Sequence, residues 1–266
     1  MIKPGEIQQK ARAAGVRDQQ IEKDYVLSWI LAGIAAHNQL SAQLVFKGGT
    51  VLKKVYFDDY RYSEDLDFTL LDNAVTNEQI FAWCNEVFDH VREEANIPLQ
   101  IIDNNEHEGG INFYIGYTGP LGGAGGNKRV KVDISRSEQI VIAPVKMAAL
   151  INYSDLGEYN LLCYTLEEVF IEKMRCVIQR MAARDFYDLW YLLEHHEIEA
   201  DHLMNKFAQK CIAKNLKSAS FPVKLDERLP QYKARWKQSL SEQIKPLPDF
   251  DQVVREVQRY IKRLKF

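Results

Sequence analysis

Two kinds of hydrophobic periodicity divide this chain near Ser137 and limit its architecture more than any other feature. Before that point, apolar and polar residues alternate over short runs such as "LDFTLL" and "KRVKVDIS", which is the pattern of half-buried β-strands. After it, segments such as "TLEEVFIEKMRCVIQRM" and "RDFYDLWYLLEHH" carry apolar residues three and four positions apart, as helices do. We therefore expect an α+β protein, with a mixed β-sheet flanked by helices in residues 1–137 and a helical bundle in residues 138–266.

Local signals predict further elements in both halves. "RDQQIEKDYVLSWILAGIAAH" is a predicted helix with Asp18 as candidate N-cap, and "TNEQIFAWCNEVFDHVREEA" begins with a capping box of Thr76 and Gln79. "QLVFKGGT", "LQIID" and "INFYIGYTG" are predicted strands, and the glycine-rich "PLGGAGGN" is a predicted hairpin loop. In the second half "PVKMAALIN" and "ADHLMNKFAQKCIA" have a helical character, and Thr165 with Glu168 predicts another capping box. Residues 215–248 show no clear pattern.

Composition excludes several classes of protein. The chain has 266 residues, 46% of them apolar, and a formal net charge of −3, so no global basic field marks a nucleic-acid binder. Its apolar stretches are too short to span a bilayer, and its first residues lack the pattern of a signal peptide. The four cysteines are scattered without a CxxC pair, which argues against a zinc site or a disulfide framework. We expect a cytoplasmic protein with reduced, buried cysteines.

The acidic strand "LDFTLL" is the first candidate for chemistry. Side chains alternate along a strand, so Asp65 and Asp67 point to one face while Leu66 and Phe68 point to the other. Two carboxylates at this spacing are within reach of one Mg²⁺ or Mn²⁺ ion, which prefers such oxygen ligands. A solvated sheet edge is the alternative, and this motif alone does not decide between the two.

A third carboxylate, Asp133, lies in "KRVKVDIS" opposite the apolar Val132 and Ile134. If this strand neighbours "LDFTLL", three carboxylates meet on one face and repel one another unless metal ions neutralise them. Two metal ions clamped by shared carboxylates are a common device for phosphoryl and nucleotidyl transfer. The alternative for Asp133 is an ordinary surface position.

A cluster of basic residues forms the second candidate, in "EKMRCVIQRMAARDFYDLW". On a helix, Lys173, Arg180 and Arg184 lie at spacings of seven and four residues and share roughly one face. Such cations suit a triphosphate. The alternative is a solvated basic stripe, with Asp185 capping the helix that follows.

Four segments in order, "EKDYVLSWIL", "FKGGTVLKKVY", "RYSEDLDFTL" and "EKMRCVIQR…ARDFYDLW", resemble the AbiEii/AbiGii toxin family of nucleotidyltransferases, within the DNA polymerase β-like nucleotidyltransferase superfamily. The resemblance runs from about Glu22 to Leu193. It implies a nucleotidyltransferase-type sheet, with the helical half closing the active-site cleft. Members are toxins of toxin–antitoxin and abortive-infection systems, paired with a separate antitoxin, and some transfer nucleotides to the acceptor end of tRNA.

The resemblance assigns roles residue by residue. The turn before the acidic strand resembles the family's triphosphate-binding turn, and the three aspartates resemble its metal-binding carboxylates. The implied catalytic residues are Asp65, Asp67, Asp133, Lys173 and Asp185, of which the first three are the implied metal ligands. The implied nucleotide-binding residues are Gly48, Gly49, Thr50, Ser63, Lys173 and Arg180. Two features depart from the wider superfamily: Lys47 stands where an apolar residue is usual, and the gap from Gly49 to Asp65 is long.

The expected activity is Mg²⁺- or Mn²⁺-dependent transfer of a nucleoside monophosphate from an NTP to an acceptor hydroxyl, with release of pyrophosphate. The expected partners are the NTP, an RNA acceptor such as a tRNA 3′ end, and a separate antitoxin protein, with no membrane. Two alternatives stay open. One is a non-catalytic regulator that binds nucleotide and antitoxin, and the other is a metal-dependent nuclease or phosphodiesterase that uses the same carboxylates.

Overall fold

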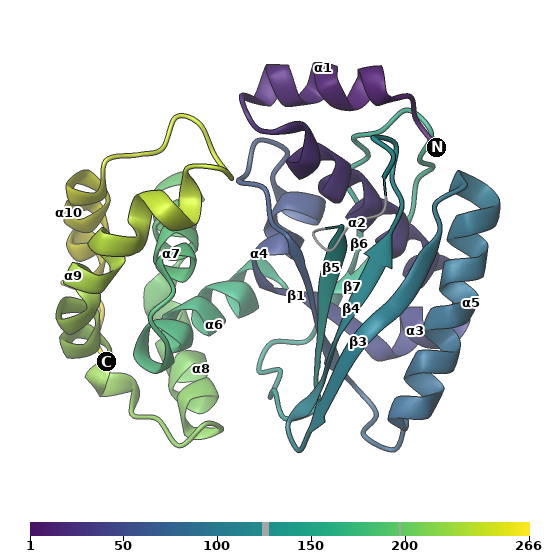
Figure 1. The fold of residues 1–266 in the computed structure, drawn as a ribbon. Helices are drawn as coiled ribbons and strands as arrows, with labels where there is room; N and C mark the ends of the chain where they lie inside the picture. Colours follow the sequence, from purple (N-terminus) through teal and green to yellow (C-terminus); the bar gives the residue numbers. More distant parts are fainter. Residues whose placement is uncertain (124–127, 197) are drawn as a thin grey trace. The chain divides into compact units, whose positions relative to one another are not determined.

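The chain folds into two compact units in a computed structural model that describes residues 1–123, 128–196 and 198–266 (Figure 1). The first unit contains Met1–Glu138 and Pro144–Cys163, and the second contains Gln139–Ala143 and Tyr164–Phe266. The first carries the sheet and the second is helical, so the α+β prediction is confirmed. The predicted closure of a cleft by the helical half stays a prediction.

A mixed sheet forms the centre of the first unit, with seven strands among the described residues in the order β3-β4-β5-β2-β1-β7-β6. Strand β2 runs parallel to β5, and β1 runs parallel to β7, while the remaining neighbours are antiparallel. The two acid-bearing strands, β2 and β5, are therefore direct neighbours. The strand bounds are β1 Leu44–Lys47, β2 Asp65–Leu70, β3 Leu99–His107, β4 Gly110–Tyr117, β5 Arg129–Ser135, β6 Val145–Ala148 and β7 Asn160–Cys163.

Helices cover the apolar side of this sheet. Helix α2 contacts β5 and β7, and α5 packs against α2 and β3 (Figure 1). The buried side chains Leu66, Phe68, Val132 and Ile134 belong to the core of this unit. Burying them stabilises the unit by roughly 1.5–3 kcal/mol each. The helices of the first unit are α1 Pro4–Ala14, α2 Asp18–Ala36, α3 Asn38–Gln43, α4 Gly48–Val51, the π-helical turn η1 Leu52–Tyr56, and α5 Asn77–Ala95.

An aromatic cluster forms part of the core of the second unit. The rings of Phe186 and Tyr232 stack with centroids 5.2 Å apart, and Trp236 and Phe250 pack edge to face at 5.3 Å. These contacts join α7, α9 and α10. The elements are α6 Leu166–Gln179, α7 Ala183–His195, α8 Ala200–Ile212, the 3₁₀ turn η2 Ser218–Ser220, α9 Phe221–Leu240 and α10 Phe250–Ile261.

Three sequence interpretations need correction or completion. The segment "PVKMAALIN" is not a helix: Val145–Ala148 forms β6, because a short apolar run fits either structure and its pairing with β7 decides. The basic cluster does not lie on one helix, since α6 ends at Gln179 and Arg180 is extended, with φ −136° and ψ 161°. The unassigned residues 215–248 contain the 20-residue helix α9, which has Pro230 in its interior.

Capping was predicted with mixed success. The box of Thr76 and Gln79 is present in both directions. Asp18 is not the N-cap of α2, because that position belongs to Arg17. Thr165 Oγ1 accepts the N–H of Glu168 at 3.2 Å, yet the Glu168 carboxylate does not return the bond.

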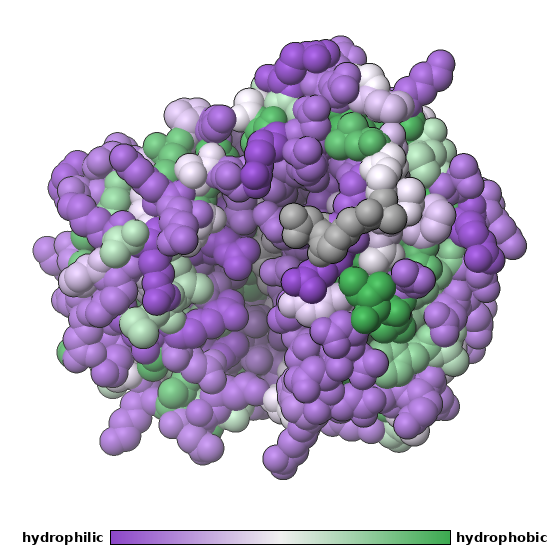
Figure 2. Space-filling view, viewed as in Figure 1, coloured by the Kyte–Doolittle hydropathy of each residue, from purple (hydrophilic) through white to green (hydrophobic). Residues whose placement is uncertain are grey.

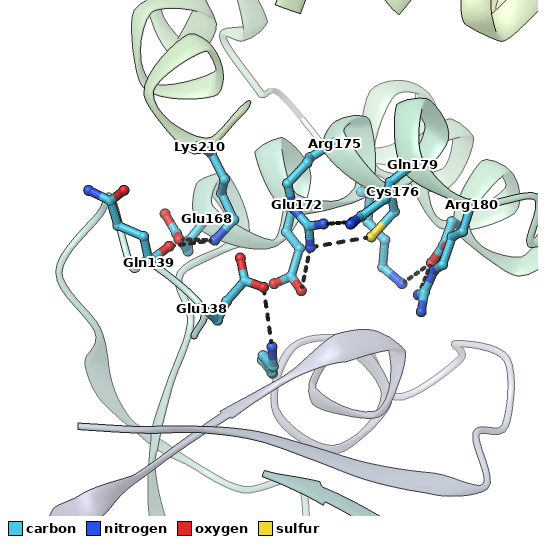
Figure 3. A network of polar contacts seen from close by, with 12 residues as sticks. Glu138, Gln139, Glu168, Glu172, Arg175, Cys176, Gln179, Arg180 and Lys210 are labelled. Atoms are coloured by element: carbon cyan, nitrogen blue, oxygen red, sulfur yellow. Dashed lines mark hydrogen bonds and ion pairs between the residues drawn. The ribbon is translucent and has the colours of Figure 1, made fainter. Parts of the chain in front are cut away.

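The Glu168 carboxylate instead accepts the backbone N–H groups of Val141 and Ile142 at 3.1 and 2.9 Å, and Lys210 Nζ lies 2.6 Å from its Oε1. Figure 3 shows Glu168, Lys210 and Gln139 together in this arrangement. Both charged side chains are fully buried. A buried carboxylate needs a cation nearby, and this requirement outweighs the capping interaction.

The surface and the cysteines agree with the composition. Hydrophilic residues cover most of the face in Figure 2, and the four cysteines are buried free thiols. Among the described residues, no helix has both the length and the apolar character needed to cross a bilayer. The predicted hairpin between β4 and β5 joins two antiparallel neighbours, but residues 124–127 of its loop lie outside the described residues.

Candidate active site

Three aspartates lie together on neighbouring strands of the first unit. Asp65 and Asp67 are half-buried on β2, while Leu66 and Phe68 between and beyond them are buried, as the alternation predicts. In the parallel pairing of β2 with β5, Asp67 stands opposite Asp133. Paired residues on adjacent strands point to the same face, so the predicted juxtaposition of these carboxylates is present in the fold.

Lys131 lies on the same face and was missed by the sequence analysis. It stands opposite Asp65 and two residues before Asp133, and its Nζ lies 2.5 Å from Asp133 Oδ2. Burial lowers the pKa of Lys131, but the hydrogen bond and charge of Asp133, with the charges of Asp65 and Asp67, outweigh it and raise the pKa above its usual value. Lys131 is therefore a cation at pH 7. We call Asp65, Asp67, Lys131 and Asp133 the acidic face.

The glycine turn before η1 lies against this face. Gly48 follows β1 and has φ +80°, a left-handed conformation that side-chain-bearing residues rarely adopt. A Cβ on Gly48 would collide with the Asp67 carboxylate, so only glycine allows that side chain its position. Gly49 is buried at the start of α4. The turn and the acidic strand are thus in contact, as the motif order suggested.

Thr50 and Ser63 are engaged inside the first unit. Thr50 Oγ1 lies 2.7 Å from Ser63 Oγ and also hydrogen-bonds the backbone carbonyl oxygen of Asp65. Both side chains are buried. Their hydroxyls tie the glycine turn to the beginning of β2, so they position Asp65 within the fold. Their predicted role in nucleotide binding stays a prediction.

Lys47 has a defined place beside the acidic face. It lies on β1 as the cross-strand partner of Asp67, and its Nζ lies 4.0 Å from the carboxylate of Glu138. Sequence reasoning treated Lys47 only as a departure from an apolar position. The carboxylate of Glu138 favours a charged lysine at this position.

The second candidate cluster belongs to the helical unit. Lys173 Nζ lies 2.8 Å from Asp185 Oδ1 and 2.7 Å from Asp188 Oδ2, and Arg180 Nε donates to Asp185 Oδ2 at 2.7 Å. The side chains of Lys173, Asp185 and Asp188 are at most 6% exposed, whereas that of Arg180 is 60% exposed. We call these four residues the buried ion cluster.

Opposite charges within this cluster stabilise the ionised forms of its buried side chains. Burial lowers the pKa of Lys173, but Asp185 and Asp188 more than reverse this, and its pKa is raised. Burial raises the pKa of Asp185, but Lys173 and Arg180 outweigh it and its pKa is lowered. Asp185 is therefore not a helix cap: the N-cap of α7 is Ala182, and the carboxylate is bound to cations instead.

The remaining basic residues of that segment are dispersed. Arg175 is buried and contacts Glu172 and Gln179 on its own helix, as Figure 3 shows. Arg184 is half-buried in the first turn of α7. The break at Arg180 separates these side chains, so the predicted single basic face is wrong.

Hard oxygen donors on the acidic face fit a divalent metal ion. Three of the four residues that define this face carry carboxylates and the fourth carries an ammonium. Carboxylate oxygens are what Mg²⁺ and Mn²⁺ prefer. Among the described residues, however, no three His, Cys, Asp or Glu side chains are already gathered to hold a metal ion. The contact of Asp133 with Lys131 is consistent with that finding.

Comparison with known proteins identifies the family. A family model described as "Nucleotidyl transferase AbiEii toxin, Type IV TA system" matches residues 29–256, the greater part of the chain. A search of curated protein sequences finds no match.

Solved structures share the fold. MenT4, a nucleotidyltransferase toxin from Mycobacterium tuberculosis H37Rv, is 18% identical with a TM-score of 0.71, over 100% of this chain and 91% of that one. JHP933 from Helicobacter pylori is 18% identical with a TM-score of 0.57, over 93% of this chain and 92% of its own. A putative nucleotidyltransferase from H. pylori is also 18% identical, with a TM-score of 0.59 over 94% of this chain and 100% of that one.

Proposed function

This chain belongs to the AbiEii nucleotidyltransferase toxin family of type IV toxin–antitoxin systems, and from that premise we propose that it transfers a nucleoside monophosphate from an NTP to an acceptor hydroxyl. The observation that carries the proposal is the pairing of β2 with β5, which sets Asp67 opposite Asp133 and beside Asp65. Such a group of carboxylates on one face of a sheet, next to a glycine turn, suits metal-assisted nucleotidyl transfer.

Asp65, Asp67 and Asp133 would hold Mg²⁺ or Mn²⁺. When bound, the ion supplies Lewis-acid polarisation of the α-phosphate and neutralises the charge that develops on the leaving pyrophosphate. Asp65 and Asp67 lie on one face of β2, and the Thr50 hydrogen bond to the Asp65 carbonyl holds the beginning of that strand. The chain's contribution is the placement of these oxygens on a rigid strand.

Bond changes in the proposed reaction balance without another reactant. The acceptor oxygen forms a bond to the α-phosphorus, the bond from that phosphorus to the bridging oxygen breaks, and pyrophosphate leaves. The hydroxyl proton passes to a carboxylate, and Asp133 is the candidate base because it lies across from Asp67. Backbone N–H groups of Gly48, Gly49 and Thr50 would bind the β- and γ-phosphates.

The family resemblance adds three residues of the helical unit to the proposed machinery: Lys173, Asp185 and Arg180. In the helical unit, Lys173 is bonded to two carboxylates, which makes it a structural cation as well as a candidate for offsetting triphosphate charge. Arg180 is the exposed member of its cluster and is the residue there most accessible to an NTP phosphate. The RNA acceptor, expected to be a tRNA 3′ end, and an antitoxin encoded as a separate protein are also parts of the proposal.

The test is a transfer assay with total tRNA, Mg²⁺ and each α-³²P-labelled NTP in turn, comparing the wild type with Asp65→Asn. The matched control is Glu64→Gln, which neutralises the neighbouring acid, paired with Lys23 at 3.0 Å and not a member of the acidic face. We expect label on RNA with the wild type and Glu64→Gln, and a loss of about 1,000-fold with Asp65→Asn, which corresponds to about 4 kcal/mol.

Other outcomes identify the alternatives. Shortened RNA without incorporated label indicates a nuclease. Toxicity in cells that survives Asp65→Asn, with no label transferred by any variant, indicates a non-catalytic binder and contradicts the proposal.

A further inference from the structure

Lys131 is the one basic residue among the four that define the acidic face. Its position is set by β5, where it precedes Asp133 by two residues and stands opposite Asp65. Its ammonium lies 2.5 Å from Asp133 Oδ2, and the side chains of Lys131 and Asp133 are 34% and 36% exposed. The lysine thus contacts the carboxylate that the proposed reaction needs as metal ligand or base.

An ammonium and a divalent ion compete for the same carboxylate. Both bind through its oxygen atoms, and their charges repel at the short distance that a shared ligand imposes. In this structure Asp133 is hydrogen-bonded to Lys131, while Asp65 and Asp67 lie on the neighbouring strand β2. An ion that used all three carboxylates would have to displace the ammonium from Asp133.

Lysine is suited to such an exchange. Its ammonium ends a flexible four-carbon chain, and one third of this side chain is exposed, so the charge can move into water at little cost. A fully buried lysine could not leave in this way, as Lys173 illustrates with its two carboxylate contacts and 6% exposure.

We propose that Lys131 is a resident counter-ion of the acidic face that competes with the divalent metal ion for Asp133. In the metal-free protein it neutralises part of the repulsion among the three aspartates. Metal binding moves its ammonium off Asp133, which then completes the proposed site. This inference rests on the proposed function for the presence of a metal ion, but it concerns occupancy and not turnover.

The experiment measures Mn²⁺ binding to the full chain by electron paramagnetic resonance of the free ion, without NTP or RNA. Lys131→Met removes the charge and keeps much of the side-chain volume, while Lys131→Arg keeps the charge. Arg129→Met is the matched control, because Arg129 is two residues earlier on the same face of β5 and rests on the Tyr114 ring at 4.3 Å. Lys131→Met with Asp133→Asn tests whether any gain acts through Asp133.

We expect Lys131→Met to bind Mn²⁺ about tenfold more tightly than the wild type, which corresponds to about 1.4 kcal/mol. Lys131→Arg and Arg129→Met should stay within about twofold, and the gain should vanish in the double variant. Thermal melting in EDTA should show a lower Tm for Lys131→Met than for Arg129→Met, because the aspartates lose their counter-ion.

Unchanged or weaker Mn²⁺ binding by folded Lys131→Met overturns the inference. If that variant instead loses NTP affinity in the presence of Mg²⁺, Lys131 belongs to the triphosphate site. The two proposals can fail separately. If Lys131→Met binds Mn²⁺ more tightly but no nucleotide is transferred by the wild type, this inference holds and the proposed function is rejected. If the wild type transfers nucleotide but Lys131→Met binds Mn²⁺ as the wild type does, the proposed function holds and this inference is rejected.

Discussion

The acidic face of the sheet and the buried ion cluster of the helices contain the same residue types in opposite circumstances. The cluster matches two cations with two carboxylates, and three of its four side chains are buried. The acidic face has three carboxylates and one lysine, all half-buried. Buried charges need partners because an unpaired one costs several kcal/mol, whereas half-exposed charges are also stabilised by water. Half-exposed carboxylates, which solvent and ligands can reach, are the better candidates for ligand binding.

Removing Lys173 should cause the largest loss of stability. Lys173→Met removes an ammonium that contacts two buried carboxylates, Asp185 and Asp188, so the free energy of unfolding should fall by about 3–5 kcal/mol. Urea denaturation followed by circular dichroism measures it. Adding Asp188→Asn to Lys173→Met should restore part of the loss. A fall below about 1 kcal/mol would show that the cluster is not a stabilising unit and would weaken the contrast with the acidic face.

Gly48→Ala tests whether the turn beside the acidic face requires a glycine. A Cβ at φ +80° collides with the Asp67 carboxylate, so we expect a stability loss of about 1–3 kcal/mol, with much weaker nucleotide transfer. Gly5→Ala in α1 is the control, because apart from the backbone of its own helix and its chain neighbours nothing lies within 4 Å of its Cβ position, and it should be neutral or slightly stabilising. If the two alanine variants have equal stability, the turn does not depend on glycine.

Protonation of Asp185 should contribute to the loss of stability at low pH. Its pKa is lowered from the ordinary value of 3.8, so it contributes stability that is fully present above about pH 3.8 and is lost as the pH falls through the folded-state pKa. Urea midpoints between pH 6 and pH 2.5 should therefore fall more steeply for the wild type than for Asp185→Asn, which has no such proton to gain. Parallel curves for the two proteins would contradict this assignment.

Arg180→Gln should have the smallest effect on stability. Its guanidinium is 60% exposed although it bonds Asp185, and exposed ion pairs contribute at most about 1 kcal/mol. We expect a change in the urea midpoint well below that of Lys173→Met. A weaker apparent affinity for NTP in the same variant would support its predicted nucleotide role. A stability loss as large as that of Lys173→Met would show that exposure is a poor guide to importance in this cluster.

Local patterns predicted much of the fold because they depend on neighbouring residues. Alternation in "LDFTLL" placed Asp65 and Asp67 on one face, and the Thr76 capping box placed the start of α5. The sequence indicated two separate helical segments here, but it did not predict that the first ends at Gln179, since no glycine or proline marks that position. The extended backbone of Arg180 leaves this residue beside Asp185, a tertiary contact that helical periodicity cannot report.

Register explains what sequence reasoning missed in the candidate site. That Asp67 faces Asp133 depends on which strands pair and at which offset, and no short motif encodes either. Lys131 looked like any polar residue in an alternating strand until the pairing placed it opposite Asp65. The contact of Gly48 with the Asp67 carboxylate is equally non-local, although the glycine pair marked the turn itself.

A double-mutant cycle on nucleotide transfer tests the central claim most directly, namely that the paired carboxylates of β2 and β5 act as one site. Transfer of labelled NMP to RNA is measured for the wild type, Asp67→Asn, Asp133→Asn and the double variant under one set of conditions. Residues that work as a unit are strongly non-additive, so the double variant should be within about threefold of the weaker single variant. Multiplying losses, or full activity in either single variant, would contradict the account.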